Sequence, residues 1–257
     1  FCHQLGPAHL PMLPRPRAAL SCLMAATNRR AFSAAPASWV VDTLKNAQCV
    51  AFDVDSTVIT EEGIDVLAAH CGAGEAVAAW TAKAMGGSVK FEDALAARLE
   101  LIKPSRSDIA ECLAAHPPQL NAGVAELVEL LHARGTAVYL VSGGFRLMIN
   151  PVADMLDISH DRVFANTILF DEAGNFTGFD ASEPTSADGG KPKVIGALKE
   201  QHGYDPVIMV GDGATDLQAR PPADAFVGFG GIAVREVVKE GADWFVEDFE
   251  EVLKLVR

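Results

Sequence analysis

The sequence has no apolar run long enough to cross a membrane as a helix, which needs about 20 consecutive residues. Its five cysteines include no CxxC pair, so they indicate neither a zinc site nor a disulfide framework. Cys49 and Cys71 fall in apolar patterns that are typical of reduced packing residues. We therefore expect no membrane partner and a reducing compartment.

Positive charge is scarce outside the first 39 residues. The chain has 34 acidic and 21 basic residues, and four arginines of residues 1–39 account for four of the basic ones. The remainder therefore carries 17 basic residues against 34 acidic ones. A body this acidic lacks the basic face that nucleic-acid binding requires, so we expect no nucleic-acid partner.

Residues 1–39 contain no acidic residue and are rich in arginine, alanine and serine. This composition is typical of an organelle transit peptide and favours a mitochondrial matrix or a plastid stroma. Two alternatives stay open, a disordered leader and translated upstream sequence with the true start at Met24. In both cases the protein would be cytoplasmic.

Short β-type runs alternate with helical patterns from residue 40 onward. The sequences VAELVELLHARG and KVIGALKEQHG have apolar residues at helical spacing and end at a glycine. Such units predict a Rossmann-like parallel sheet sandwiched by helices, an α/β fold. Two short β-type runs, one before and one after DEAGN, predict a hairpin appended to that sheet. The expected strands are residues 49–53, 137–142, 206–211, 225–228 and 244–246.

Residues 60–120 contain helical patterns and no convincing strand. They separate the first strand from the others, so we expect an inserted helical cap at 60–120 and a core at 40–59 and 121–257. Arg98 lies on the apolar stripe of one predicted cap helix. An arginine there either reaches the rim of the apolar face or is held for an anionic ligand, and the pattern alone favours the rim.

Polar residues gather where the expected strands end, which is where parallel sheets bind ligands. Asp53 and Asp55 share strand parity and point the same way if their strand continues. Each polar group alone has an ordinary explanation as a helix cap, a turn or a solvated lysine, but four together indicate a site. The four groups are FDVDST (Asp53, Asp55), VSGGF (Ser142, Gly143, Gly144), GGKPK (Lys191) and GDGATD (Asp212, Thr215, Asp216).

The chemistry of these groups suits a phosphate and a metal ion. Clustered aspartates repel one another unless a cation lies among them, and oxygen-only ligands suit Mg²⁺. A Ser-Gly-Gly turn offers a hydroxyl and N–H groups to a phosphate, while one carboxylate can attack phosphorus and another can transfer protons. An EF-hand does not explain the first group, because its sixth position is Val58 and its twelfth is Ile64.

The stretches FDVDSTV, VSGGF, GGKPK and GDGATD resemble, in order, the four motifs of the haloacid dehalogenase superfamily of phosphatases. Further stretches such as EEGID, AMGG, FANTILF and DWFVEDFEEV are similar to the phosphoserine phosphatases of that superfamily, from about residue 40 to the end. The resemblance implies Mg²⁺-dependent hydrolysis of O-phospho-L-serine through an aspartyl phosphate, which is the last step of L-serine biosynthesis.

The resemblance also implies a role for each motif residue. Asp53 is then the nucleophile, and Asp55 is the general acid and base, with a raised pKa before the first step. Mg²⁺ is held by Asp53, the backbone carbonyl of Asp55 and Asp212, with Asp216 in support. In the cap, Glu62 meets the substrate ammonium and Arg98 its carboxylate. The other implied substrate-binding residues are Met85, Gly86, Ser142, Gly143, Gly144, Lys191 and Thr215; Thr215, like Thr57, equally fits a loop cap.

Three alternatives to this reading stay open. A sister phosphatase for another small phosphomonoester, such as a sugar phosphate, needs neither Glu62 nor Arg98. A receiver-type signalling domain also places aspartates and a lysine at strand ends, but it is shorter and has no inserted cap. A non-catalytic binder of phosphorylated ligands does not need both Asp53 and Asp55. The sequence leaves a monomer and a homodimer equally open.

Overall fold

The computed structural model describes residue 1, residues 35–85 and residues 90–257, with the side chains of 82–85 outside the description. The expected leader at 1–39 therefore falls almost entirely outside the described residues. The chain divides into Phe1–Ala31 and a compact unit of Phe32–Arg257, which holds all the described helices and strands. Within the described part of the chain, no helix is both long and apolar enough to span a membrane.

Six parallel strands form the main sheet, in the order β3-β2-β1-β6-β7-β8. In β1, Cys49 pairs with Ala137 of β2 on one side and with Val207 of β6 on the other. The strand order reverses beside β1, and parallel sheets open a crevice at such a point, outside the carboxyl ends of the strands. The strands are β1 (Cys49–Phe52), β2 (Ala137–Phe145), β3 (Val163–Asn166), β6 (Val207–Gly211), β7 (Ala225–Phe229) and β8 (Trp244–Val246).

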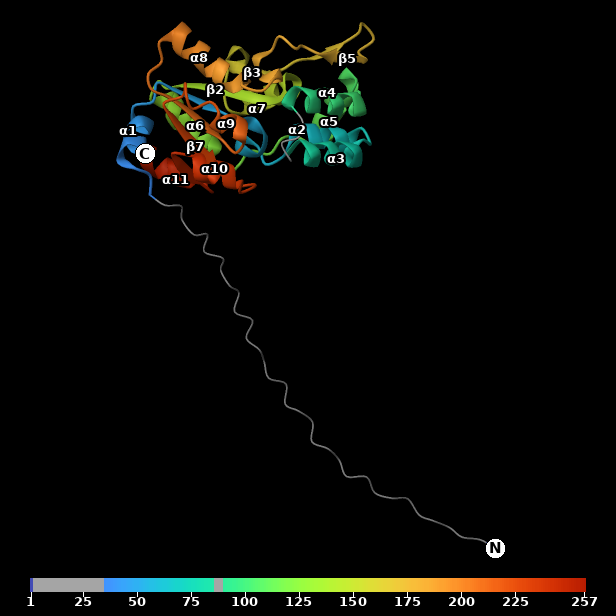
Figure 1. The fold of residues 1–257 in the computed structure, drawn as a ribbon, viewed down its shortest axis with the longest axis horizontal. Coiled ribbons are helices and arrows are strands. Elements are labelled where there is room, and N and C mark those ends of the chain that lie inside the picture. The colour runs from blue at the N-terminus through green and yellow to red at the C-terminus, as the bar shows by residue number, and fades with distance from the viewer. Residues whose placement is uncertain (2–34, 86–89) are drawn as a thin grey trace. The chain divides into compact units, whose positions relative to one another are not determined.

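Helices cover both faces of the main sheet (Figure 1). Val50 and Phe52 enter one apolar core and Cys49 and Ala51 the other, because successive strand side chains point to opposite faces. The first core includes α1 (Ser38–Lys45), α6 (Val124–Ala133), α7 (Arg146–Met155) and α11 (Phe249–Val256). The second lies under α8 (Gly190–His202), α9 (Ala214–Leu217) and α10 (Glu236–Gly241).

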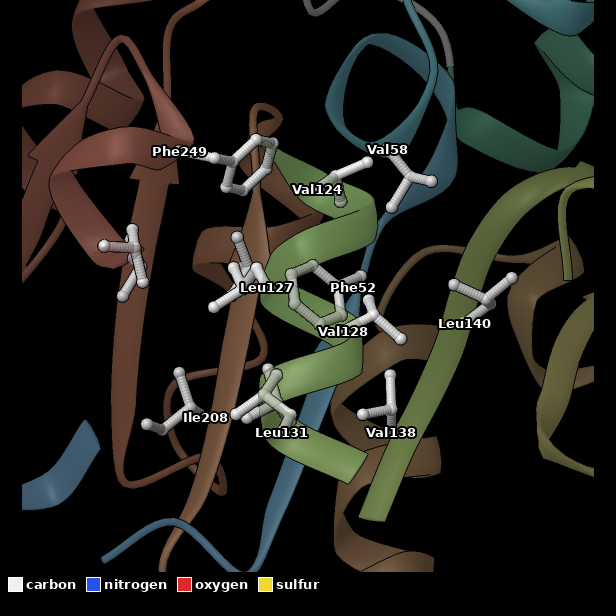
Figure 2. Packing of buried hydrophobic residues seen from close by; sticks show 14 of the residues in the cluster. Phe52, Val58, Val124, Leu127, Val128, Leu131, Val138, Leu140, Ile208 and Phe249 are labelled. Carbon is white, nitrogen blue, oxygen red and sulfur yellow. The ribbon is translucent and has the colours of Figure 1, made fainter. Parts of the chain in front are cut away.

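Helix α6 shows how the apolar pattern builds the first core (Figure 2). Its buried residues recur at helical spacing and lie over the side chains of the central strands. Burying each such side chain contributes about 1.5–3 kcal/mol. The predicted end of this helix is confirmed, because Gly135 follows it at a φ of 76°. The packed residues are Val124, Leu127, Val128 and Leu131 of α6 and Phe52, Val138, Leu140 and Ile208 of the sheet.

The five expected strands are confirmed with small shifts at their ends, but the expected hairpin is partly wrong. The first half of its first run, Val163–Asn166, is instead β3 and pairs in parallel with β2 at the edge of the main sheet. Ala165 and Asn166 are fully buried there, which an appended hairpin would not provide. Only β4 (Ile168–Phe170) and β5 (Phe176–Phe179) form the antiparallel hairpin, and they make a separate sheet.

The described part of residues 60–120 is helical, as expected. An isolated bridge joins Ile59 to Leu120, so the chain enters and leaves this segment at one place. The apolar cluster of these helices also includes Phe145 and Ile168, so the segment packs onto β2 and the hairpin. We keep 60–120 as the proposed cap. Its helices are α2 (Gly63–His70), α3 (Gly74–Met85), α4 (Phe91–Ile102) and α5 (Arg106–Ala115).

Candidate active site

The strand β1 ends before Asp53, and the chain then turns. The expectation that Asp53 and Asp55 point the same way as residues of one continuing strand is therefore wrong. Asp53 still donates its N–H to the carbonyl of Val210 at 2.9 Å, but the following residues form a wide turn, Val54–Val58. Within this turn Ser56 has a φ of 54°, in the left-handed region. Both carboxylates nevertheless line one cavity, because the turn, rather than the pleat, brings Asp55 back toward Asp53.

Lys191 lies between two carboxylates at the start of α8. Its Nζ is 2.8 Å from Oδ1 of Asp53 and 2.5 Å from Oδ1 of Asp216, and all three side chains are buried. Burial alone would lower the pKa of Lys191, but the charges of Asp216 and Asp53 outweigh it and raise that pKa well above its ordinary value. Lys191 therefore carries a fixed positive charge beside the expected nucleophile.

Three buried aspartates, Asp53, Asp212 and Asp216, place carboxylate oxygens within 4.8 Å of one another. Hard oxygen donors and an excess of negative charge over Lys191 fit Mg²⁺. Both oxygens of Asp216 already have protein partners, Lys191 Nζ and the N–H of Gly213 at 2.9 Å. Asp53 and Asp212 line the cavity and Asp216 does not, so the first two are better placed as direct ligands, with Asp216 in support.

Asp55 combines a buried environment with a close approach to the glycine turn. Its Oδ1 accepts the N–H of Gly63 at 2.7 Å. Burial raises the pKa of Asp55 to about 7, and the charges of Glu62 and Asp53 act in the same direction, against the Gly63 N–H. A Cβ on Gly144 would lie 2.6 Å from Oδ2 of Asp55, so a glycine is required there. Asp55 is therefore suited to donate a proton near neutral pH.

A cavity of about 470 Å³ brings together most of the residues that the sequence singled out. It lies at the carboxyl ends of β1, β2 and β6 and below the proposed cap. Asp216 and Thr57 are motif residues that do not line it, in keeping with supporting positions. The predicted residues that line it are Asp53, Asp55, Glu62, Arg98, Ser142, Gly143, Gly144, Lys191, Asp212 and Thr215.

The cap contributes two acids, Glu62 and Asp65, and one base, Arg98, to this cavity. Glu62 accepts a hydrogen bond from Ser56 Oγ at 2.8 Å, and burial raises its pKa. Arg98 donates from Nε to the carbonyl of Ala94 at 3.2 Å, and burial lowers its pKa. Because Arg98 lines the cavity rather than the rim of an apolar face, its position favours the anionic-ligand interpretation.

Two predicted residues cannot be placed in the site. Met85 ends α3 but its side chain lies outside the described residues, and Gly86 lies outside them altogether. Their predicted contact with substrate stays a prediction. Thr57, which the sequence left ambiguous, is buried and donates to Oδ1 of Asp212 at 2.9 Å. It therefore orients the carboxylate of Asp212, an expected metal ligand.

Two further residues around the site were given no role by the sequence, although Asn166 lies in the quoted stretch FANTILF. Arg235, in the loop after β7, donates from Nη1 to the carbonyl of Asp212 at 3.0 Å, forms an ion pair with its carboxylate, and lies 3.6 Å from Glu62. Asn166 donates to the carbonyl of Gly143 at 2.8 Å. The sequence feature nearest to Arg235 is the glycine pair at 230–231, in the same loop.

A family model of haloacid dehalogenase-like hydrolases matches residues 50–219. The chain belongs to this family. The membership confirms the expected α/β fold and removes the receiver-type signalling alternative, since the family is one of hydrolases.

Its relatives are more specific. The chain is 52% identical to the chloroplastic phosphoserine phosphatase of Arabidopsis thaliana, over 85% of this chain and 75% of that protein. It is also 52% identical to the phosphoserine phosphatase of Rattus norvegicus, over 81% of this chain and 92% of that one. The chain therefore groups with the phosphoserine phosphatases, as the motifs indicated.

One solved structure agrees with this grouping by name, and a second shares the fold. A phospho-aspartyl intermediate analogue of phosphoserine phosphatase matches with a TM-score of 0.72 and 29% identity, over 83% of this chain and all of that chain. The DsGPDH structure of Dunaliella salina matches with a TM-score of 0.75 and 34% identity, over 86% of this chain but only 38% of that chain.

Proposed function

We propose that the protein hydrolyses O-phospho-L-serine to L-serine and phosphate, with Mg²⁺, through an aspartyl phosphate on Asp53. One observation carries the proposal. The Asp53 carboxylate lies 2.8 Å from the buried ammonium of Lys191, in the same cavity as Asp55, a carboxyl whose pKa is raised to about 7. A nucleophile, an electrostatic partner for phosphate and a proton donor thus face one space.

In the first step a carboxylate oxygen of Asp53 attacks phosphorus and the bond to the serine oxygen breaks. Asp55 gives its proton to that oxygen, so that L-serine leaves as a neutral alcohol. Lys191 and the hydroxyl of Ser142 hold the phosphoryl oxygens and stabilise their charge in the transition state.

In the second step Asp55, now ionised, takes a proton from a water molecule that attacks the phosphorus of the aspartyl phosphate. The bond from Asp53 to phosphorus breaks, phosphate leaves, and Asp55 is protonated again. When bound, Mg²⁺ would supply charge neutralisation at the phosphoryl group, with Asp53, Asp212 and the Asp55 carbonyl as its proposed protein ligands.

The charges of the cap favour an amino-acid substrate. Glu62 and Arg98 line the cavity on the cap side, together with a second acid, Asp65. A zwitterionic substrate has an ammonium group for Glu62 and a carboxylate for Arg98, which Arg can bind with two hydrogen bonds. A sugar phosphate has neither charge, so this pair supports phosphoserine over the sister-phosphatase alternative.

The proposal extends to the pathway and the compartment. Hydrolysis of phosphoserine would make the last step of L-serine biosynthesis. The acid-free, arginine-rich segment of residues 1–39 and the chloroplastic name of the Arabidopsis relative support import into an organelle. Determining the N-terminus of the mature protein checks this part, because an imported protein begins near residue 40 and an unprocessed one retains the arginine-rich segment.

Phosphate release from three substrates tests the proposed activity. O-phospho-L-serine, glucose 6-phosphate and O-phosphoethanolamine are compared with and without Mg²⁺. We expect turnover of phosphoserine with Mg²⁺, at least tenfold above the others, and little turnover after chelation. Equal or better turnover of the sugar phosphate would contradict the substrate assignment.

A further inference from the structure

One peptide unit in the phosphate-binding turn is held at both ends by side chains. The carbonyl of Gly143 accepts the side-chain amide of Asn166 at 2.8 Å. The N–H of the same peptide, on Gly144, donates to Oγ of Ser142 at 3.0 Å. The pairing of β2 with β3 shifts between Val141 and Phe145, so this peptide lies where the regular strand ladder is interrupted.

The orientation of this peptide decides what Ser142 can do. A hydroxyl has one hydrogen to donate and two lone pairs that accept. Because Ser142 Oγ accepts the N–H of Gly144, its own hydrogen is free for a phosphate oxygen. If the peptide turned over, a carbonyl would face Ser142 and would take that hydrogen. Glycine on both sides offers little steric resistance to such a rotation.

Asn166 prevents the rotation, and Thr185 fixes Asn166. Asn166 is fully buried at the end of β3, and its Oδ1 accepts the hydroxyl of Thr185 at 2.9 Å. That bond leaves the amide nitrogen of Asn166 to face Gly143. Neither side chain lines the cavity, so neither is placed to contact a substrate bound there.

Thr185 also lies against the helix that carries Lys191. It belongs to the short turn Pro184–Ser186, and α8 begins at Gly190. The two segments pack so closely that a Cβ on Gly190 would lie 2.0 Å from the carbonyl oxygen of Pro184. The chain of contacts from Gly143 through Asn166 to Thr185 therefore ends beside the residue preceding Lys191.

We propose that Asn166 and Thr185 are positioning residues for phosphoryl transfer. They hold the Gly143–Gly144 peptide so that Ser142 presents its hydroxyl hydrogen to the phosphoryl group, in fixed register with Lys191. This inference rests on the proposed function and adds two residues that act through Ser142 and do not contact substrate.

Four variants test the inference. Thr185→Val removes the hydroxyl with little change of shape, and Thr185→Ser restores it. Asn166→Asp keeps an acceptor for Thr185 and removes the donor to Gly143. The matched control is Thr136→Val, because Thr136 is a buried threonine that donates to the carbonyl of Ala47 at 2.9 Å beside the amino-terminal end of β2.

Three measurements separate a positioning role from a structural one. These are kcat/KM for phosphoserine, the affinity for inorganic orthophosphate by calorimetry, and Tm. We expect Thr185→Val to lower kcat/KM and phosphate affinity each by about fivefold, the size of one hydrogen bond, and Thr185→Ser to recover both. Asn166→Asp should lower both by more than tenfold. Thr136→Val should lower Tm as much as Thr185→Val does and leave both other quantities unchanged.

The measurements distinguish failure of the positioning role from failure of the proposed function. If Thr185→Val and Asn166→Asp lose only Tm, as the control does, the positioning role is wrong while the proposed function stands. If the wild-type protein releases no phosphate from phosphoserine, the proposed function is wrong, and orthophosphate affinity still decides the role of the two residues. If Asn166→Asp fails to fold, the pair of Thr185 variants gives the answer alone.

Discussion

The carboxylate of Asp55 accepts the backbone N–H of Gly63 at 2.7 Å. Gly63 is the first residue of α2, which opens the proposed cap, so the expected proton donor is tied directly to the cap. A Cβ on Gly63 would lie 3.1 Å from that carboxylate oxygen, which shows how closely the two approach. The position of the proton donor and the position of the cap are therefore linked through one hydrogen bond.

The protonation of Asp55 predicts a fall of activity at alkaline pH. Burial raises the pKa of Asp55 to about 7 from 3.8, so the carboxyl is protonated below that value and ionised above it. The first step needs the proton, so kcat/KM for phosphoserine should decrease as pH rises through about 7. A profile measured from pH 5 to 9 checks this. Asp55→Asn should lower kcat/KM by about 100-fold or more and abolish its decrease at alkaline pH.

The close approach of Asp55 to Gly144 predicts that Gly144→Ala is strongly inhibitory. The new Cβ would lie 2.6 Å from Oδ2 of Asp55, and one of them must move. We expect kcat to fall by at least tenfold in steady-state assays. The control is Gly196→Ala inside α8, where the nearest atom lies at 3.7 Å. It should keep full activity and stabilise the protein by about 0.5–1 kcal/mol. Unchanged kcat in Gly144→Ala would contradict the geometry at Asp55.

The two cap charges predict separable changes in specificity. Arg98→Met should raise KM for phosphoserine by about 10–100-fold but change KM little for O-phosphoethanolamine, which has no carboxylate. Glu62→Gln should remove the preference for phosphoserine over phospholactate, which has no ammonium group. Measuring KM for all three compounds with both variants checks the assignment. If each variant changed KM equally for all three compounds, Glu62 and Arg98 would not recognise the charged groups of the substrate.

Mg²⁺ should stabilise the folded protein through Asp212. A ligand that binds the folded state alone raises Tm. We expect a rise in Tm when Mg²⁺ is added without substrate, and loss of that rise in Asp212→Asn. Glu172→Gln, in the exposed turn of the β4–β5 hairpin, removes the same charge and should keep the rise. A Tm that Mg²⁺ shifts equally in Asp212→Asn would place the ion elsewhere.

The sequence predicted the sheet because each strand and helix has a clear local pattern. It could not separate β3 from the hairpin, because the run VFANTILF is β-like throughout and only pairing partners distinguish Val163 from Ile168. The motifs likewise predicted the residues that the cavity brings together. They did not predict how Asp55 reaches Asp53, because that depends on the left-handed conformation of Ser56, which no period in the sequence reveals.

Residues that act through others were harder to predict. Arg235 reaches Asp212 from a loop 23 positions away, and Asn166 reaches Gly143 from the next strand. Neither belongs to the four motifs, and the stretch FANTILF gave Asn166 no role, because the folded sheet and not spacing along the chain sets their partners. Thr57 shows the intermediate case, where the motif marked the residue but only the contact with Asp212 gave its task.

Covalent labelling of Asp53 tests the central claim most directly. The wild-type protein is mixed with phosphoserine labelled at phosphorus, quenched in acid during the first turnover, digested and examined by mass spectrometry. We predict a phosphoryl group on the peptide that carries Asp53, and neither label nor turnover in folded Asp53→Asn. Rapid wild-type turnover without label, together with an active Asp53→Asn variant, would contradict the account.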